Sequence, residues 1–90
     1  MADIRIQYVT KSAPHHERIT HLGTDYATWP IEHVIFWIEN GSSTFHTLEA
    51  GKRAEIAVRQ GAQRKYVQTH ADNTWRDNLL SLPPCKVAAA

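Results

Sequence analysis

Alternating apolar and polar positions predict several strands in this chain of 90 residues. In residues 4–10, IRIQYVT, the side chains of Ile4, Ile6 and Tyr8 fall on one face, as in a strand with one buried side. A second short strand is predicted within residues 18–23, RITHLG. Later runs with the same alternation, STFHTL, RAEIAVRQ, QRKYVQT and a short TWR, predict an antiparallel meander of three or four strands.

Two turns of this meander carry sequence signals. Gly61 and Ala62 stand between two alternating runs, which predicts a type II′ hairpin. At the next turn, within HADN, Asn73 is the residue best able to adopt a positive φ.

One helix is predicted, over residues 30–40, PIEHVIFWIEN, after a loop with the sequence GTDYATWP. Pro30 suits the first turn, where its missing amide hydrogen would have no partner, and Gly41 is expected to end the helix as a left-handed cap. Phe36 lies about 140° from the apolar stripe on the helical wheel and is expected to be exposed. The residues of the stripe, which must face a sheet, are Ile31, Val34, Ile35 and Ile38.

The stretch DNLLSLPPC, residues 77–85, holds three leucines, two prolines and the only cysteine. A terminal segment tied down by apolar groups completes a core, so we expect these leucines to shield the interior. In an extended segment Leu80 and Leu82 share a face, whereas in a helical turn capped by Asp77 the pair is Leu79 and Leu82. The sequence leaves both conformations open.

These elements predict a single α+β domain over residues 1–90, with its core at about residues 3–85 and a disordered tail at 86–90. One helix packs on a mainly antiparallel sheet, in the order two strands, helix and meander. A hydrophobic content of 42% excludes a disordered chain, and no apolar run approaches the ~20 residues of a membrane helix. The sequence begins without a leader pattern and has one cysteine, so we expect a cytoplasmic protein that does not bind membranes.

The charge of the chain restricts the kinds of partner that it is expected to bind. A formal net charge of +1 excludes a strong overall attraction to nucleic acid or to anionic lipid. Five of the basic residues, with the single acid Glu55, fall within residues 52–65, whereas residues 25–49 hold four acids and no lysine or arginine. The domain is therefore expected to have a basic end and an acidic end.

Aromatic residues supply two candidate binding sites. Phe36, with Trp37 beside the apolar stripe, could form a surface for a protein partner or for self-association. The loop before the helix supplies Asp25, Tyr26 and Trp29, residue types that line small-ligand pockets. The alternative for Trp29 is packing as a lid on the core.

The basic hairpin at residues 52–66 is a candidate nucleic-acid site, because cations with interleaved aromatic residues can stack bases along a charged groove. Against this, Lys65 and Tyr66 point to opposite faces of one strand, which favours a solvated hairpin with Tyr66 in the core. The cationic candidates are Arg59, Arg64, Lys65 and Arg76.

Catalysis and metal binding have weaker signals. Cys85 could act as a nucleophile if His70 lay near it with Asp72 or Asp77 as the orienting acid, but a free thiol after two prolines more often packs at the edge of a core. Adjacent histidines in one loop do not readily complete a tetrahedral zinc site, so we expect no metal and no cofactor. The histidines in question are His15, His16 and His21.

Two segments, WPIEHVIFWIENGSSTF and KYVQTHADNTWRDNLLSLPPC, resemble a family of small bacterial proteins, domain of unknown function family 3892. The resemblance covers about residues 17–85, and its specific part is the ending Asp-Asn-Leu-Leu-x-Leu-Pro-x-Cys. This chain departs from the family pattern at Val67-Gln68, where the family has Leu-Arg, at Asn73, where it has Gly, and at Pro84, where it has an acid. Losing that arginine puts in doubt any anion site that the family builds there. The matching positions are Trp29, Gly41, Lys65, Tyr66, Thr69, Asp72, Asp77, Asn78, Leu79, Leu80, Leu82, Pro83 and Cys85.

The resemblance implies one small module and no activity. Because the sequence also lacks paired carboxylates, a glycine-rich phosphate loop and metal-ligand spacing, we expect a non-catalytic module that acts through a protein partner. Nucleic-acid binding is the second hypothesis, and a cysteine-dependent enzyme is the third.

Overall fold

The computed structural model describes residues 2–87, and in this range the chain forms eight strands, one α-helix and two 3-10 turns. The predicted tail at residues 86–90 falls partly outside this range, since residues 88–90 are not described. The elements are β1 Ala2–Arg5, β2 Tyr8–Lys11, η1 His16–Arg18, β3 Ile19–Gly23, β4 Thr28–Pro30, α1 Ile31–Glu39, β5 Ser43–Glu49, β6 Lys52–Gln60, β7 Lys65–Ala71, β8 Thr74–Arg76 and η2 Asn78–Ser81.

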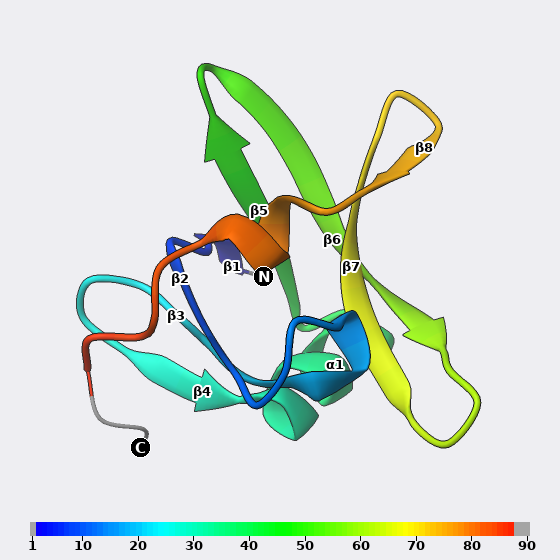
Figure 1. Ribbon diagram of the computed structural model, residues 1–90. Coiled ribbons are helices and arrows are strands. Elements are labelled where there is room, and N and C mark those ends of the chain that lie inside the picture. The colour runs from blue at the N-terminus through cyan, green and yellow to red at the C-terminus, as the bar shows by residue number, and fades with distance from the viewer. Residues whose placement is uncertain (1, 88–90) are drawn as a thin grey trace.

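The strands form two sheets that share one core (Figure 1). The larger sheet has the order β1-β5-β6-β7-β8, with β1 parallel to β5 and every other pair antiparallel. The smaller sheet has the order β2-β3-β4 and is antiparallel throughout. The predicted α+β class, with one helix on a mainly antiparallel sheet and a meander after it, is confirmed. Within residues 2–87 there is no helix of the length and apolarity needed to cross a membrane.

The core is made by the faces that the alternation predicts as apolar. Phe45, Ile56 and Val67 point inward from β5, β6 and β7, and Val34 of α1 packs against them. Leu22 of β3 joins the same cluster from the smaller sheet. One face of the larger sheet is therefore covered by the helix, the smaller sheet and η2.

Residues 4–10 form two strands in two different sheets, where the pattern predicts one continuous strand. The chain crosses between the sheets at Ile6 and Gln7: the Ile6 amide donates to His46 O at 2.7 Å, and the Gln7 amide donates to Gly23 O at 2.9 Å. Ile6 is buried in the core cluster, but in β2 the residue that joins this cluster is Val9 and not Tyr8, so the parity of the inward side chains changes after the crossing.

The segment predicted as a loop before the helix contains β4, and Pro30 is the N-cap of α1 and not its first residue. The helix ends as predicted. Gly41 has φ +75° and its amide donates to Ile38 O, while the Ser42 amide donates to Trp37 O. These two bonds form a Schellman motif, which satisfies carbonyl groups of the last turn.

The type II′ turn predicted at Gly61-Ala62 is wrong. Gly61 is not among the residues with positive φ, and four residues, 61–64, connect β6 to β7, closed by a bond from the Gly61 amide to Arg64 O. Glycine is needed here for space: a Cβ at this position would lie 2.7 Å from Arg64 O and 2.7 Å from Glu17 Oε2. At the next turn, Asp72 and Asn73 both adopt positive φ, as predicted for Asn73.

The turn between β5 and β6 carries a strained residue. Ala50 has φ +49° and Gly51 has φ +79°, the pattern of a two-residue type I′ hairpin. Alanine in this region is disfavoured by contact of its Cβ with the backbone, whereas asparagine tolerates it. We expect Ala50→Asn to raise the free energy of unfolding by about 1 kcal/mol, measured by urea denaturation. Ala62→Asn, at an exposed turn residue with ordinary φ, is the control, and an equal gain there would contradict the strain argument.

The leucine-rich terminal segment lies against the core, as expected. Residues 78–81 form a 3-10 turn in which Leu79 is fully buried, and Leu82 after the turn has extended backbone angles. Asp77 precedes this turn without forming the predicted side-chain cap. Pro83 O accepts a bond from the Val9 amide at 2.9 Å, and Leu80 O accepts one from Lys11 Nζ at 3.1 Å. The segment therefore covers β2 by hydrogen bonding as well as by apolar contact.

Candidate functional site

The second face of the five-stranded sheet, which we call the outer face, presents a row of side chains that crosses all five strands. Paired positions in the register place Arg5 beside His46, His46 beside Glu55, Glu55 beside His70, and His70 beside Trp75. The remaining side chains of this face follow from the same alternation. They are Asp3, Thr44, Leu48, Arg53, Ala57, Arg59, Tyr66 and Gln68.

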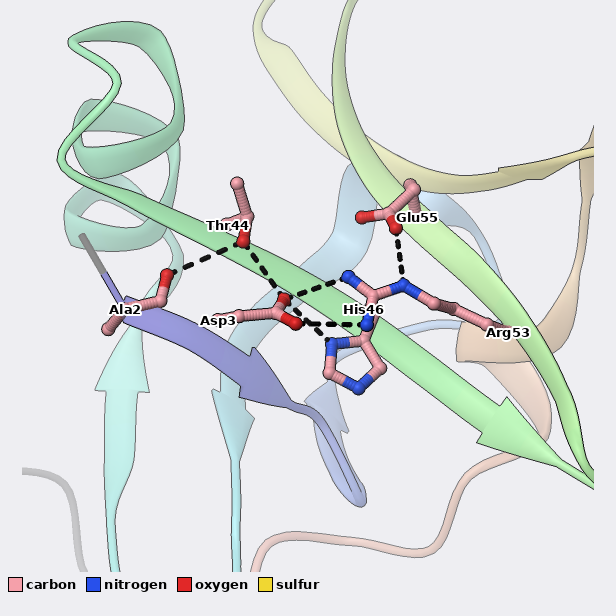
Figure 2. A network of polar contacts seen from close by, with 6 residues as sticks. All are labelled: Ala2, Asp3, Thr44, His46, Arg53 and Glu55. Atoms are coloured by element: carbon pink, nitrogen blue, oxygen red, sulfur yellow. Dashed lines mark hydrogen bonds and ion pairs between the residues drawn. The ribbon is translucent and has the colours of Figure 1, made fainter.

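One part of the outer face is a network of polar contacts around Asp3, shown in Figure 2. The Arg53 guanidinium donates to both oxygens of Asp3 at 2.9 Å and, through Nε, to Glu55. Thr44 Oγ1 donates to Asp3 Oδ1 at 2.9 Å, and His46 Nδ1 lies 3.1 Å from the same oxygen. In Figure 2 these side chains stand in front of β1 and β5, with the smaller sheet behind.

The network favours the charged forms of both partners. Hydrogen bonds from Arg53, and then from Thr44, hold the pKa of Asp3 well below its usual range. The same bonds to Asp3, followed by those to Glu55, raise the pKa of Arg53. Since both side chains are close to half exposed, the network fixes the orientation of these groups more than it stabilises the fold.

The other part of the outer face is a cluster of one cation and three aromatic rings. Arg59 Cζ lies 4.3 Å from the ring centroid of Trp75 and 5.9 Å from that of Tyr66. Arg59 Nη1 donates to Gln68 Oε1 at 3.0 Å, and the ring of His70 lies 4.9 Å from that of Trp75. Gln68 is buried beneath this cluster, while Trp75 remains 39% exposed.

The structure separates the four cations predicted as a nucleic-acid site. Arg59 lies in the aromatic cluster, and Arg64 lies in the turn between β6 and β7. Lys65 points the other way, toward the helix, where Nζ lies 2.7 Å from Glu39 Oε2. Arg76 lies 3.8 Å from Asp72, near the tip of the β7–β8 hairpin.

Tyr66 was expected in the core and lies on the outer face beside Arg59, so that expectation is wrong. Val67 takes the inward position, opposite Val58 of β6. Because successive residues of a strand face opposite sides, an inward Val67 requires an outward Tyr66.

The candidate partner site on the helix has one exposed ring. Phe36 is 62% exposed, as predicted from the helical wheel. Trp37 instead packs against the core, with its ring stacked 6.3 Å from Phe45 and at right angles to Trp29.

The three residues proposed for a ligand pocket have separate neighbours. Asp25 accepts hydrogen bonds from Tyr8 Oη at 2.6 Å and from Gln7, and the bond from Tyr8 lowers its pKa. Tyr26 is 74% exposed, and Trp29 packs on the core as a lid.

Cys85 and His70 lie in different parts of the fold. Cys85 is half-buried against β3, where its Sγ would lie 3.2 Å from a Cβ at Gly23. His70 lies on the outer face against Trp75. The structure therefore does not bring together the residues that the cysteine hypothesis needs.

The three histidines considered for a zinc site also have different neighbours. His16 packs near Tyr66. Burial lowers its pKa below the ordinary value, against the charge of Asp77, which raises it, and with the charge of Arg59, which lowers it. His21 Nδ1 lies 2.9 Å from Thr20 Oγ1, and His15 is exposed. Among residues 2–87, no three His, Cys, Asp or Glu side chains are grouped so that they could hold a metal ion.

A surface cavity of about 650 Å³ opens between the tips of the β5–β6 and β7–β8 hairpins. Its floor includes Ala54 and Ala71, and its charged residues are all exposed. A ligand in this hollow would remain largely in water, so the cavity is a weaker candidate than the outer face.

Sequence reasoning identified Arg59 but not the surface to which it belongs. The polar positions of each strand are visible in the alternation, yet β1 lies beside β5 only because the chain crosses between sheets at Ile6 and Gln7. The available signal was the choice of residues, because arginine and aromatic side chains are placed at outward positions of β6, β7 and β8.

Comparison with known proteins gives a family and no relative of established activity. No curated protein and no solved structure matches the chain. The family model described as "Protein of unknown function (DUF3892)" matches residues 5–83, which include the helix, every strand except most of β1, and most of the leucine-rich segment. The resemblance inferred from the sequence is confirmed, and the chain belongs to the DUF3892 family.

Proposed function

We propose that this chain is a non-catalytic module that binds a protein partner through the outer face of its five-stranded sheet. The observation that carries the proposal is the composition of that face. It presents three arginines, a tryptophan and a tyrosine, and none of its residues is a lysine. Arginine, tryptophan and tyrosine are enriched in protein interfaces and dominate their binding energy, whereas lysine is depleted.

The fixed orientation of two arginine side chains on this face also supports the proposal. Arg53 is held by Asp3 and Glu55, and Arg59 is held by Trp75 and Gln68, so both long side chains are fixed before a partner arrives. Ordering such side chains costs about 0.5–1.5 kcal/mol each when an interface forms, and that cost is reduced here.

Single-stranded nucleic acid is the second candidate, favoured by the contact of Arg59 with two aromatic rings. Two observations make it weaker. Arg59 already covers a face of the Trp75 ring on which a base would stack, and Asp3 and Glu55 place negative charge on the same surface.

We place the module in the bacterial cytoplasm. Its single cysteine is a free thiol, which is compatible with a reducing compartment, and bacterial origin is what the resemblance of its terminal segment implies. The separation of Cys85 from His70 supports the absence of cysteine-dependent catalysis.

The test is quantitative capture of partners from a native lysate, comparing the parent protein with Trp75→Ala and Phe36→Ala. Both residues are large exposed aromatics, but only Trp75 lies on the outer face. We expect Trp75→Ala to lose the proteins that the parent captures, and Phe36→Ala to retain them, with both variants folded by circular dichroism. Loss with Phe36→Ala alone, or retention with Trp75→Ala, would place the partner site elsewhere.

Two further measurements separate the alternatives in the same experiment. Nuclease treatment of the lysate should leave the captured proteins unchanged, and their disappearance would favour nucleic-acid binding. Light scattering on the purified protein should give the monomer mass. A dimer that Trp75→Ala converts to a monomer would mean that the outer face binds a second copy of the chain.

A further inference from the structure

Resting on the proposed function, we infer that Arg59 is the docking point for a carboxylate side chain, so that the partner presents an acidic segment to the outer face. The inference depends on how this guanidinium is held, on the donors it leaves free and on the charge around it.

The guanidinium of Arg59 is fixed in place. Trp75 and Tyr66 both lie within 6 Å of Cζ, at 4.3 and 5.9 Å from their ring centroids, which is the range of cation–π attraction. The bond from Nη1 to Gln68 Oε1 fixes its rotation, and Gln68 is itself held by a bond from Nε2 to Arg76 O.

Most of the donors of Arg59 have no partner within the described residues. A guanidinium carries five N–H groups in a fork that matches a carboxylate, and here only Nη1 donates to another group in residues 2–87. Arg53, six residues earlier on β6 and on the same face, shows the contrasting state, because its donors are already taken by Asp3 and Glu55. On this face, Arg59 is the arginine that contacts aromatic rings and forms no ion pair within 4 Å among residues 2–87.

The surroundings of Arg59 favour an anion. Arg18 and Arg64 lie beside the β6–β7 turn, at the same end of the hairpin, and neither forms an ion pair with another described residue. The acids near this end are Glu17, whose carboxylate lies against Gly61, Glu39, which pairs with Lys65, and Asp77, which lies 3.9 Å from His16. The positive charge of Arg59 also reaches His16: burial lowers the pKa of that histidine most, the charge of Asp77 opposes the shift, and the charge of Arg59 adds to it.

A protein carboxylate fits these observations better than a phosphate of a nucleic-acid strand. Binding of a strand would need free aromatic faces for its bases and a continuing path of cations. The Trp75 ring is already in contact with Arg59 and His70, and the acids of the Asp3 network lie further along the face. A carboxylate needs only the free edge of the guanidinium, and its binding leaves the contacts of Arg59 with Trp75 and Gln68 in place.

The experiment is a titration of the ¹⁵N-labelled full chain with a capped oligoglutamate peptide, and with capped oligoglutamine as the uncharged match. The signals followed are the Nε–H of Arg59 and the indole N–H of Trp75. We expect saturable shifts of both with oligoglutamate, at a millimolar dissociation constant suited to one exposed ion pair, and none with oligoglutamine. Added salt should weaken binding.

Variants assign the contact. Arg59→Gln should weaken oligoglutamate binding by about fivefold or more, and Arg59→Lys should restore only part of it, because lysine keeps the charge and loses the fork. Arg5→Gln is the matched control, an exposed arginine at the other end of the same face whose Nη2 donates to Leu48 O. It should change binding by less than about twofold.

Three results would overturn the inference: no shift at Arg59 or Trp75, equal weakening by Arg5→Gln, or tighter binding of oligothymidine at the same two signals. Its failure is separable from that of the proposed function. If Trp75→Ala abolishes capture of the protein partner while Arg59→Gln leaves capture intact, the outer face binds protein but Arg59 does not receive its carboxylate.

Discussion

Leu79→Ala is expected to lower the free energy of unfolding by about 2–5 kcal/mol, the cost of removing a fully buried leucine. Leu79 has no exposed surface and packs in the central cluster with residues from both sheets and the helix. A domain of this size has a total stability on the order of 5–10 kcal/mol, so the variant should lose a substantial fraction of its stability and melt at a clearly lower temperature.

Urea denaturation followed by tryptophan fluorescence measures this change. Ser81→Ala is the control from the same turn, because Ser81 is exposed and its hydroxyl bonds only to Asn78 O. It should change stability by less than about 0.5–1 kcal/mol. A chain that ends at Arg76 and melts at the same temperature as the full chain would show that the leucine-rich segment is dispensable, contrary to its position in the core.

Phe45→Ala should have an effect of similar or larger size, about 3–5 kcal/mol. Phe45 is fully buried at the centre of β5, and its ring contacts both Trp29 and Trp37. Its removal opens a cavity beneath the helix and also removes aromatic contacts worth about 0.5–1.5 kcal/mol each beyond their buried area.

The matched control is Phe36→Ala, the same substitution at the exposed phenylalanine of α1. It should shift the urea midpoint by an amount corresponding to less than about 0.5 kcal/mol. Equal destabilisation by the two variants would mean that the helix is not packed with Val34 inward and Phe36 outward. Calorimetry gives a second readout, since Phe45→Ala should also lower the enthalpy of unfolding.

The meander and the helix were predictable because local patterns specify them. Each strand from β5 to β8 alternates, and the turns between them contain Ala50-Gly51, Gly61 and Asp72-Asn73. The helix combines an apolar stripe with a glycine at its end. These two signals predict its buried face, its C-terminal end and the exposure of Phe36.

The division into two sheets was not predictable from the same signals. The alternation of Ile4, Ile6 and Tyr8 in the sequence gives no sign that the chain changes backbone partners at Ile6. β4 is a three-residue strand inside a segment rich in turn-forming residues. Both depend on partners that are distant in sequence, such as His46 for Ile6. The outer face shares this dependence, since its row from Arg5 to Trp75 exists only once five strands are in register.

The junction of Val9 with Pro83 has a consequence for synthesis on the ribosome. The core cannot form completely until Leu79 and Pro83 have left the exit tunnel. The apolar surface of β2 and β3 therefore stays exposed while more than half of the chain is translated. A nascent polypeptide arrested before this point is a substrate for chaperones and proteases, and completion of the leucine-rich segment is what releases it as a folded molecule.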